Sequence, residues 1–458
     1  MNMVTRRDLL AGMGVVAAGS LAVREARAAA WQPKRFADCT LNVLSTSGHR
    51  QYNPVWDLLP EFQRQTGIQV VLTRVPVGDI RQKIMQDLAM NADQFDVLEV
   101  LDDTISSASR YMTSMEPFIN RDFGSVVAWS QDTAPWALRA ASVAGPVKYY
   151  PFYSGTVCGV LRDALFTDSK NQAAFKARFG YDLPVPPKTW KELQDAAQFF
   201  TREENGKQLW GVVFPGQKDP GQNVFDYFMF NEGVTYLDEK NHCNWGPKHP
   251  ENQPTVAKVA SFLQDLIYKQ KAAPPTVPGM ATNETVELYL NGGAAMVVDN
   301  LYFAWDELNS QKVIDRIGKS TSFEAPASSG DGKGGIPFYW MWGICERSKA
   351  KEQAWEFLRW FMQDENLQLT LTKGIGVYVP TDRRIGAWAA QRNLLPPAII
   401  PAVAHAQFYH LNPQIGQMRY LLQAWSEKLS LNALTPAQFV QGSGDAVEKA
   451  MVDSGLAA

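Results

Sequence analysis

The side chains that could do chemistry are spread along the 458-residue chain and do not form a known catalytic or metal-binding motif. No histidine pair has the HxxxH or HExxH spacing of a zinc site, and no Cys/His cluster has zinc spacing. The sequence also lacks a GxSxG nucleophile elbow, a Walker loop and a GxGxxG turn after a strand. The glycine-rich segment GDGKGG (330–335) lacks the P-loop frame and is interpreted as a flexible loop. We therefore expect no enzyme activity, no metal and no cofactor.

Two adjacent carboxylates, Asp102 and Asp103, follow a predicted strand. A carboxylate pair can act as general acid and base when it flanks a bond, but adjacent residues at a strand end point to opposite sides. These side chains are better suited to accept sugar hydroxyls, because hydrogen bonds to a charged group are about twice as strong as neutral ones. The rival role is the N-cap of a helix over TISSASRYM (104–112), and one Asp can cap while the other binds.

Alternating strand and helix patterns place these residues at one edge of a sheet. The patterns predict strands over 39–48, 68–76 and 95–103 and helices over 52–67 and 78–91. Strand–helix alternation of this kind predicts a parallel sheet covered on both faces, and in such sheets ligands bind beyond the carboxyl ends of the strands. Ser45, Ser47 and His49 follow the first strand, so they are candidate ligand contacts. A solvated turn with local serine hydrogen bonds is the alternative.

The middle of the chain contains two further strand-like runs with unusual features. An apolar run over 147–166 is interrupted at Tyr153-Ser154-Gly155, and the aromatic segment GIPFYWMWGICERS covers 335–348. Trp340 and Trp342 alternate on this second run and therefore project from the same face. If that face lines a binding site, the two rings stack on the ligand; if it faces the sheet interior, they belong to the core.

Composition narrows the function classes further. A net charge of -3 with no basic block argues against nucleic acid and against an anionic membrane surface. The 14 Trp and 15 Tyr exceed what a core requires, and such rings often line sites for sugars, because a flat ring covers C–H faces. The four cysteines, which can form disulfides or be buried free thiols, are Cys39, Cys158, Cys243 and Cys345.

The N-terminus has the three regions of an export signal. Arg6 and Arg7 precede an apolar stretch over 9–23 that ends in small residues, and we expect cleavage after Ala28. The arginine pair resembles a twin-arginine signal, which exports folded proteins, although an ordinary secretory signal also fits. Either route predicts a free periplasmic protein. About 430 residues remain, enough for two or three domains.

Several segments, in order, resemble the extracellular solute-binding proteins of ABC importers, in their maltose-binding-like, carbohydrate-binding branch. The similar segments are LPEFQRQTGIQVVLTRVPVGDIRQKIMQDLA (59–89), FDVLEVLDD (95–103), PKTWKELQDAAQFFT (187–201), YLNGGAAMVVDNLYFAWDEL (289–308) and AWEFLRWFMQDENLQL (354–369). Gly293 stands where the family usually has a lysine. The segment from 187 also has a capping box, Thr189 with Glu192, which predicts a helix start.

The resemblance implies an α/β, two-lobed periplasmic binding protein fold (type II): two parallel or mixed sheets flanked by helices and joined by crossing hinge strands. Residues 38–152 and 343–395 would form lobe 1, and residues 153–342 and 396–458 would form lobe 2. Gly155 and Gly343 would permit hinge motion at the crossings. The resemblance also implies a monomer that delivers its solute to the transmembrane permease subunits of an ABC importer.

Further candidate ligand contacts follow from the resemblance. They lie at the hinge, in the loop after FPGQKDPGQ, after the AAMVV strand and on a late helix: Tyr153, Ser154, Asn223, Asp226, Asp299, Asn300, Tyr302 and Arg419.

Aromatic rings alternating with Ser, Asn and Asp suit a polyhydroxylated ligand, so we expect a mono- or oligosaccharide or a polyol. An anionic ligand would call for a cluster of basic residues. Near the candidate sites only Arg50, Lys218 and Arg419 qualify, from separate segments. Glycerol-phosphate-like or other small solutes are the alternative ligands, and an exported carbohydrate-active enzyme is the second alternative function.

Overall fold

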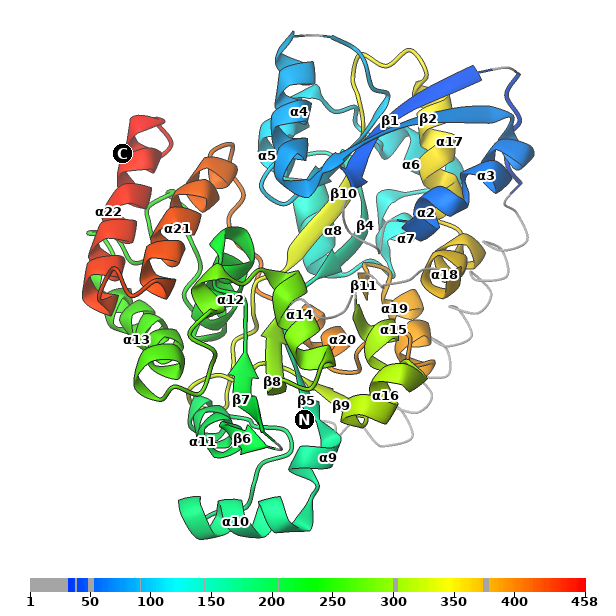
Figure 1. Cartoon of the computed structure of the whole chain (residues 1–458). Coiled ribbons are helices and arrows are strands. Elements are labelled where there is room, and N and C mark those ends of the chain that lie inside the picture. Colours follow the sequence, from blue (N-terminus) through cyan, green and yellow to red (C-terminus); the bar gives the residue numbers. More distant parts are fainter. Residues whose placement is uncertain are drawn as a thin grey trace, which may run out of the picture.

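Two mixed β-sheets with helices around them make up the protein (Figure 1). The structure is a computed structural model that describes residues 32–37, 39–47, 53–90, 92–143, 145–204, 206–299, 304–373 and 379–458. The predicted export signal lies outside the described residues. Within them, no helix is both long and apolar enough to cross a membrane, and Cys243 and Cys345 are free thiols.

The first sheet has the strand order β11-β4-β10-β3-β1-β2. Its strands are β1 (Cys39–Ser47), β2 (Ile68–Pro76), β3 (Val97–Leu101), β4 (Tyr149–Gly155), β10 (Phe338–Ile344) and β11 (Val379–Pro380). The parallel arrangement predicted for β1, β2 and β3 is confirmed, since β1 pairs in parallel with both others. β10 then lies antiparallel between β3 and β4, which makes the sheet mixed.

The second sheet has the order β6-β7-β8-β5-β9. Its strands are β5 (Cys158–Arg162), β6 (Arg202–Glu204), β7 (Lys207–Val213), β8 (Ala294–Asp299) and β9 (Ser320–Phe323). The chain passes from the first sheet to the second between β4 and β5, and it returns between β9 and β10.

Helices cover both sheets. Those before β4 are α2 (Asn53–Asp57), α3 (Leu59–Thr66), α4 (Val77–Met90), α5 (Ile105–Ala108), α6 (Glu116–Phe123), α7 (Val126–Ser130) and α8 (Pro135–Ala141). Those between β5 and β9 are α9 (Asp163–Phe166), α10 (Ser169–Phe179), α11 (Trp190–Phe200), α12 (Lys218–Asn231), α13 (Gln253–Gln264), α14 (Thr282–Leu290), α15 (Trp305–Leu308) and α16 (Gln311–Ile317). Those after β10 are α17 (Lys351–Phe361), α18 (Asp364–Lys373), α19 (Arg383–Gln391), α20 (Ile399–His405), α21 (Ile415–Ser430) and α22 (Pro436–Asp453).

The two C-terminal helices return to the helical layer of the second sheet. α21 packs against α12, and α22 packs against α13 and α21 (Figure 1). Because α12 also contacts β8, the α21 helix is carried by the part of the molecule that holds the second sheet.

Local sequence signals explain where several helices begin and end. The capping box of Thr189 and Glu192 starts α11, as predicted. Gly67 ends α3 with φ 78°, the left-handed conformation that glycine adopts without strain. The single helix predicted over 52–67 is instead two short helices, because Pro60 in the first turn lacks an N–H and favours a new helix start.

The core of the first sheet is built around Trp342 on β10. Its indole stacks on Phe152, with ring centroids 4.6 Å apart, and on Phe357, 5.1 Å apart. Gly343 lies inside β10, and a Cβ there would come within 2.8 Å of Met112 Sδ and 2.9 Å of the Tyr149 ring. Close packing inside β10 therefore requires glycine at 343. The chain crosses between the sheets before Phe338, so Gly343 lies within the strand and not at the crossing.

We expect Trp342→Ala to lower the free energy of unfolding by about 3–5 kcal/mol, because the substitution removes a fully buried ring and leaves a cavity. Urea unfolding followed by circular dichroism measures the change. Val127→Ala is the matched control: Val127 is 79% exposed, so its truncation should cost less than about 0.5 kcal/mol. A loss for Trp342→Ala as small as the control's would contradict the packing described above.

Candidate ligand-binding site at the junction of the sheets

A buried carboxylate, Glu99 on β3, ties together three strand segments near the carboxyl edge of the first sheet. It accepts hydrogen bonds from Thr46 N (3.0 Å), Thr46 Oγ1 (3.1 Å) and Tyr153 OH (3.1 Å), and Ser45 Oγ donates to it as well. Burial raises the pKa of the Glu99 carboxyl above its ordinary value, and these donors act in the opposite direction. The hydroxyl of Ser45, a predicted ligand contact, is thus fully buried and hydrogen-bonded to Glu99.

Tyr153, whose hydroxyl donates to Glu99, is part of an aromatic stack. The Tyr153 ring lies nearly parallel to Trp340, with centroids 5.1 Å apart and an interplanar angle of 11°. Trp340 is partly buried, and its Nε1–H has no partner among the described residues. Of the two tryptophans predicted as ligand contacts, Trp340 is partly exposed, whereas Trp342 is 1% exposed and packed in the core.

A second group of predicted residues meets around Asp102, directly after β3. Arg419 on α21 donates from Nη1 to Asp102 Oδ2 at 2.6 Å and from Nη2 to Asn223 Oδ1 on α12 at 2.7 Å. Tyr409 OH donates to the same Asp102 oxygen at 3.0 Å. Asp102, Asn223 and Arg419 are separated by more than a hundred residues in the sequence, and the fold brings them together at the junction of the two sheets.

Each remaining described candidate has a distinct environment. Asp226 on α12 accepts from Tyr236 OH, and Asp299 at the end of β8 accepts from Thr282 Oγ1 (3.2 Å) and Thr285 Oγ1 (2.7 Å) on α14. Asp103 accepts from Thr104 Oγ1 at 2.7 Å, and its own N–H donates to Asp102 Oδ1 at 2.9 Å.

The other candidates are less constrained by contacts. Ser154 is fully buried, and its Oγ has no partner among the described residues. Ser47 ends β1 and is partly exposed. His49, Asn300 and Tyr302 lie outside the described residues.

Four residues at or next to this junction were not predicted from the sequence: Gln222, Tyr236, Tyr339 and Tyr409. Gln222 precedes Asn223 on α12, is fully buried, and has no hydrogen-bond partner for either amide atom within the described chain. Tyr339 lies opposite Ser154 in the β10–β4 pair, and its hydroxyl also has no partner there. A polar residue inside an apolar run was the signal that could have marked Tyr339.

Two buried tyrosines at the junction, Tyr409 and Tyr236, have raised pKa values. Burial, followed by the Asp102 charge, raises the pKa of Tyr409 well above its ordinary value. Burial and the nearby Asp226 likewise raise the pKa of Tyr236. Both phenols therefore remain protonated donors at neutral pH. The arrangement can hold uncharged groups that both donate and accept hydrogen bonds beside an aromatic face.

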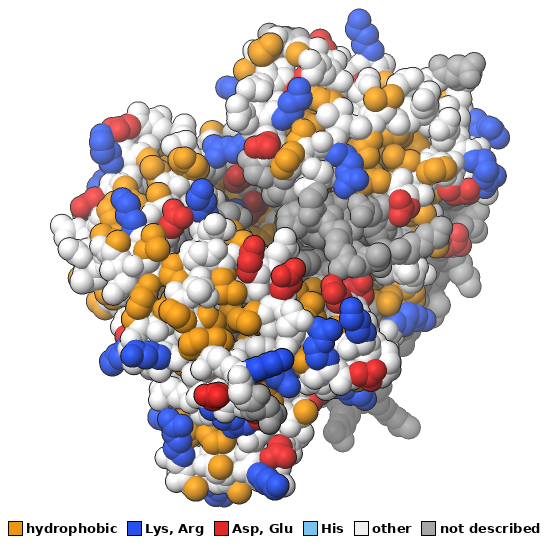
Figure 2. Space-filling view, viewed as in Figure 1, with side chains coloured by type: hydrophobic (Ala, Val, Ile, Leu, Met, Phe, Trp, Pro, Cys, Tyr) orange, Lys and Arg blue, Asp and Glu red, His pale blue; other side chains and the backbone are white. Residues whose placement is uncertain are grey.

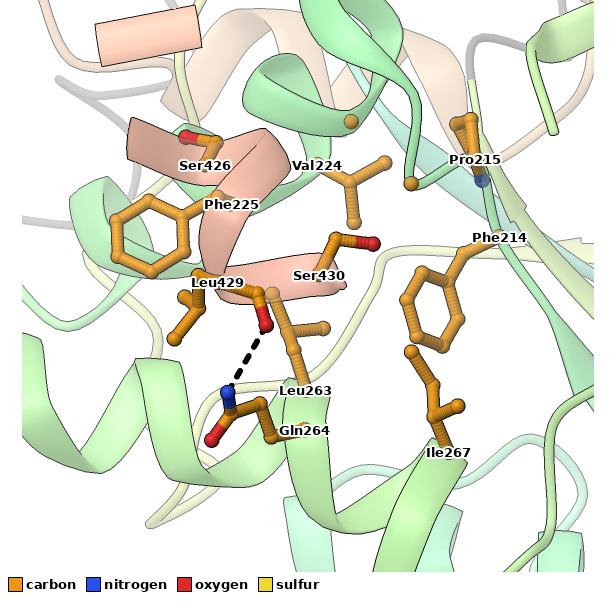
Figure 3. A pocket seen from close by; sticks show the side chains of 12 residues that line it. Phe214, Pro215, Val224, Phe225, Leu263, Gln264, Ile267, Ser426, Leu429 and Ser430 are labelled. Atoms are coloured by element: carbon orange, nitrogen blue, oxygen red, sulfur yellow. Dashed lines mark hydrogen bonds between the residues drawn. The ribbon is translucent and has the colours of Figure 1, made fainter. Parts of the chain in front are cut away.

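The molecule has a surface notch and a separate apolar pocket. The surface is notched between the part that carries α21 and α22 and the part that carries α4 (Figure 2). A separate apolar pocket lies between α12, α13 and α21, where Gln264 Nε2 donates to Leu429 O at 2.9 Å (Figure 3). None of the predicted ligand contacts lines that pocket.

A family model described as "Bacterial extracellular solute-binding protein" matches residues 46–368. Two curated proteins are similar over most of the chain. The probable amino-acid ABC transporter periplasmic-binding protein of Sinorhizobium fredii is 24% identical over 346 residues, 73% of this chain and 71% of that protein. The erythritol/L-threitol-binding protein of Mycolicibacterium smegmatis is 21% identical over 437 residues, 84% of each.

Solved structures share the fold. An ABC transporter solute-binding protein from Agrobacterium radiobacter K84, in complex with ribitol, has a TM-score of 0.70 and 19% identity, covering 91% of this chain and 100% of that one. The predicted fold class, two mixed sheets flanked by helices in a two-lobed binding-protein architecture, is confirmed.

We expect Glu99→Gln to change how stability depends on pH. Because the folded state raises the pKa of Glu99, its contribution to stability is full below the pKa of an unfolded Glu, about 4.3, and is lost as pH rises through the higher folded value. The glutamine does not titrate, so the stability of wild type minus that of the variant should fall as the pH rises from about 4. Urea unfolding across this range measures the difference, and an increase with pH would contradict the assignment.

Proposed function

Because the chain belongs to the family of bacterial extracellular solute-binding proteins, we propose that it captures a carbohydrate between two lobes and delivers it to the membrane permease of an ABC importer. The ligand is a mono- or oligosaccharide or a polyol. Two observations carry this choice: the Tyr153–Trp340 stack, and the buried, uncharged groups with no described partner on Ser154, Gln222 and Tyr339. A ring covers the C–H faces of a polyol, and the uncharged groups pair with its hydroxyls.

The two lobes of this proposal are 38–152 with 343–395, and 153–342 with 396–458. The first contains most strands of the first sheet, and the second contains β5 to β9 and the helices α21 and α22. The ligand would lie at the junction described above, in contact with Trp340, Ser154 and residues at the start of α12. Asp226 and Asp299 would border it while remaining hydrogen-bonded to Tyr236 and to α14.

Names of similar proteins support a polyhydroxylated ligand without fixing it. One relative is an erythritol/L-threitol-binding protein, and the structural neighbour from Agrobacterium radiobacter holds ribitol. The other relative is named for amino acids. A free amino acid needs a lasting partner for each of its two charges, whereas Asp102 and Arg419 are already paired with each other. Glycerol-phosphate-like solutes carry a negative charge, for which Arg419 is likewise already paired with Asp102. These solutes are the alternative ligands.

We further propose that the protein is exported and acts in the periplasm as a monomer, without enzyme activity. The leader with Arg6 and Arg7 supports export by the twin-arginine route, with cleavage after Ala28. The lack of a recognised catalytic motif in the sequence favours binding over an exported carbohydrate-active enzyme.

A thermal-shift screen of sugars, polyols, sugar phosphates, amines and amino acids tests the ligand class. A bound solute at a hundred times its dissociation constant should stabilise the protein by about 2.7 kcal/mol and raise the melting temperature. We expect the shift from neutral sugars or polyols. A shift from phosphorylated compounds or amino acids alone would reject the neutral class, and turnover of glycosides that is lost in Asp102→Asn would support the enzyme instead.

Small-angle X-ray scattering with and without the solute found in that screen tests closure of the lobes. A ligand that contacts both lobes favours the closed arrangement by its differential affinity for it. The radius of gyration should therefore decrease at saturation. An unchanged radius with saturating ligand would contradict closure as the mechanism.

A further inference from the structure

The ion pair between Asp102 and Arg419 joins the two halves of the molecule. Asp102 follows β3 of the first sheet, and Arg419 lies on α21, which packs on α12 beside the second sheet. The carboxylate receives protein donors on both oxygens: Arg419 and Tyr409 on Oδ2, and the Asp103 N–H on Oδ1.

Burial makes this pairing energetically important. Asp102 is 5% exposed and Arg419 is 6% exposed, so water screens neither charge effectively. Removing one partner of such a pair leaves the other charge buried without compensation, which is strongly unfavourable. Any solute group that competes for one member must therefore compensate the member that it displaces.

Other contacts join the same segments of the two halves. The Arg139 guanidinium of α8 lies 4.0 Å from the ring centroid of Phe408, eleven residues before Arg419. The Arg81 guanidinium of α4 lies where a Cβ on Gly416 would project, so glycine lets α4 approach the start of α21. These two contacts join α8 and α4 to the segment that carries Arg419.

Uncharged hydrogen-bonding groups are available at the junction. Buried atoms with no described partner there are Ser154 Oγ, Tyr339 OH, Trp340 Nε1 and both amide atoms of Gln222. Tyr339 is adjacent to the ion pair, because Asp102 N donates to Tyr339 O at 3.2 Å. The Arg419 Nη atoms and both Asp102 oxygens are bonded within the protein, and neutral donors and acceptors remain for a solute.

We propose that the Asp102–Arg419 pair determines the charge selectivity of the site and restricts it to uncharged solutes. This inference rests on the proposed binding function. An anionic group would compete with Asp102 for Arg419 and lie beside the displaced carboxylate, with Asp226 close by. A cationic group would displace Arg419 from Asp102. A neutral polyol leaves the pair intact.

The test is a gain of binding in Asp102→Asn. Asparagine keeps the shape and an acceptor for Tyr409, but it leaves the Arg419 charge available to an anion. Titration calorimetry compares three matched sets, erythritol with erythronate, ribitol with ribonate, and maltose with maltobionate. At least one acid should bind the variant about tenfold or more tightly than it binds wild type, as a charged hydrogen bond in a buried site allows.

Two further variants complete the design. The reciprocal change Arg419→Gln should bind 1-amino-1-deoxyribitol more tightly than wild type does, and it decides the question if Asp102→Asn does not fold. The double variant Asp102→Asn with Arg419→Gln carries a neutral pair and should lose both gains. Glu61→Gln, which frees Arg64 from a surface ion pair, is the matched control and should leave selectivity unchanged.

Folded single variants that gain no charged ligand would overturn the inference, as would wild type that binds an acid as tightly as its neutral counterpart. Failure of the proposed function is distinguishable, because it appears as wild type that responds to no neutral sugar or polyol in the thermal screen. The gain in Asp102→Asn is measured independently of that response.

Discussion

The insertion of β10 between β3 and β4 fixes the geometry on which the rest of the structure depends. Segment 338–344 follows every strand of the second sheet in the sequence and pairs antiparallel with both of its neighbours. The connections that leave and re-enter the first sheet therefore start from adjacent strands. Trp340 and Tyr153, which lie opposite each other in this pairing, form the aromatic face of the candidate site as a direct result.

Buried carboxylates on β3, directly after β3 and at the end of β8 are each matched with donors. Glu99 has three hydroxyls, Asp102 has an arginine and a phenol, and Asp299 has two threonines. Because the protein interior has a low dielectric constant, a buried polar group without a partner is costly, and a network in which every group is paired is rigid. Rigidity of the first sheet at this edge keeps the uncharged groups in place, so a solute does not have to order them when it binds.

The sequence was sufficient for the elements whose pattern is local. Periodicity located β1, β2, β3 and α4, and the Thr189 capping box located the start of α11. Three features required the tertiary structure. The Glu99 network was hidden because one charged residue in an apolar run does not reveal its partners. Alternation alone could not tell that Trp340 lies at the junction and Trp342 in the core. The Asp102–Arg419 pair spans 317 positions, a separation at which no spacing rule operates.

The late return of β10 also sets the order in which the chain can fold. β3 ends at Leu101, and the strand that covers its free edge begins only at Phe338, roughly 240 residues later. At translation rates of about 5–20 residues per second, the β3 edge stays unpaired on its β10 side for about 10–50 s during synthesis. Over that interval an apolar strand with unsatisfied backbone groups is open to pairing with other chains. A nascent polypeptide with this topology thus has a defined window in which a chaperone has a strand edge to protect, and the window closes when the aromatic segment emerges from the ribosome.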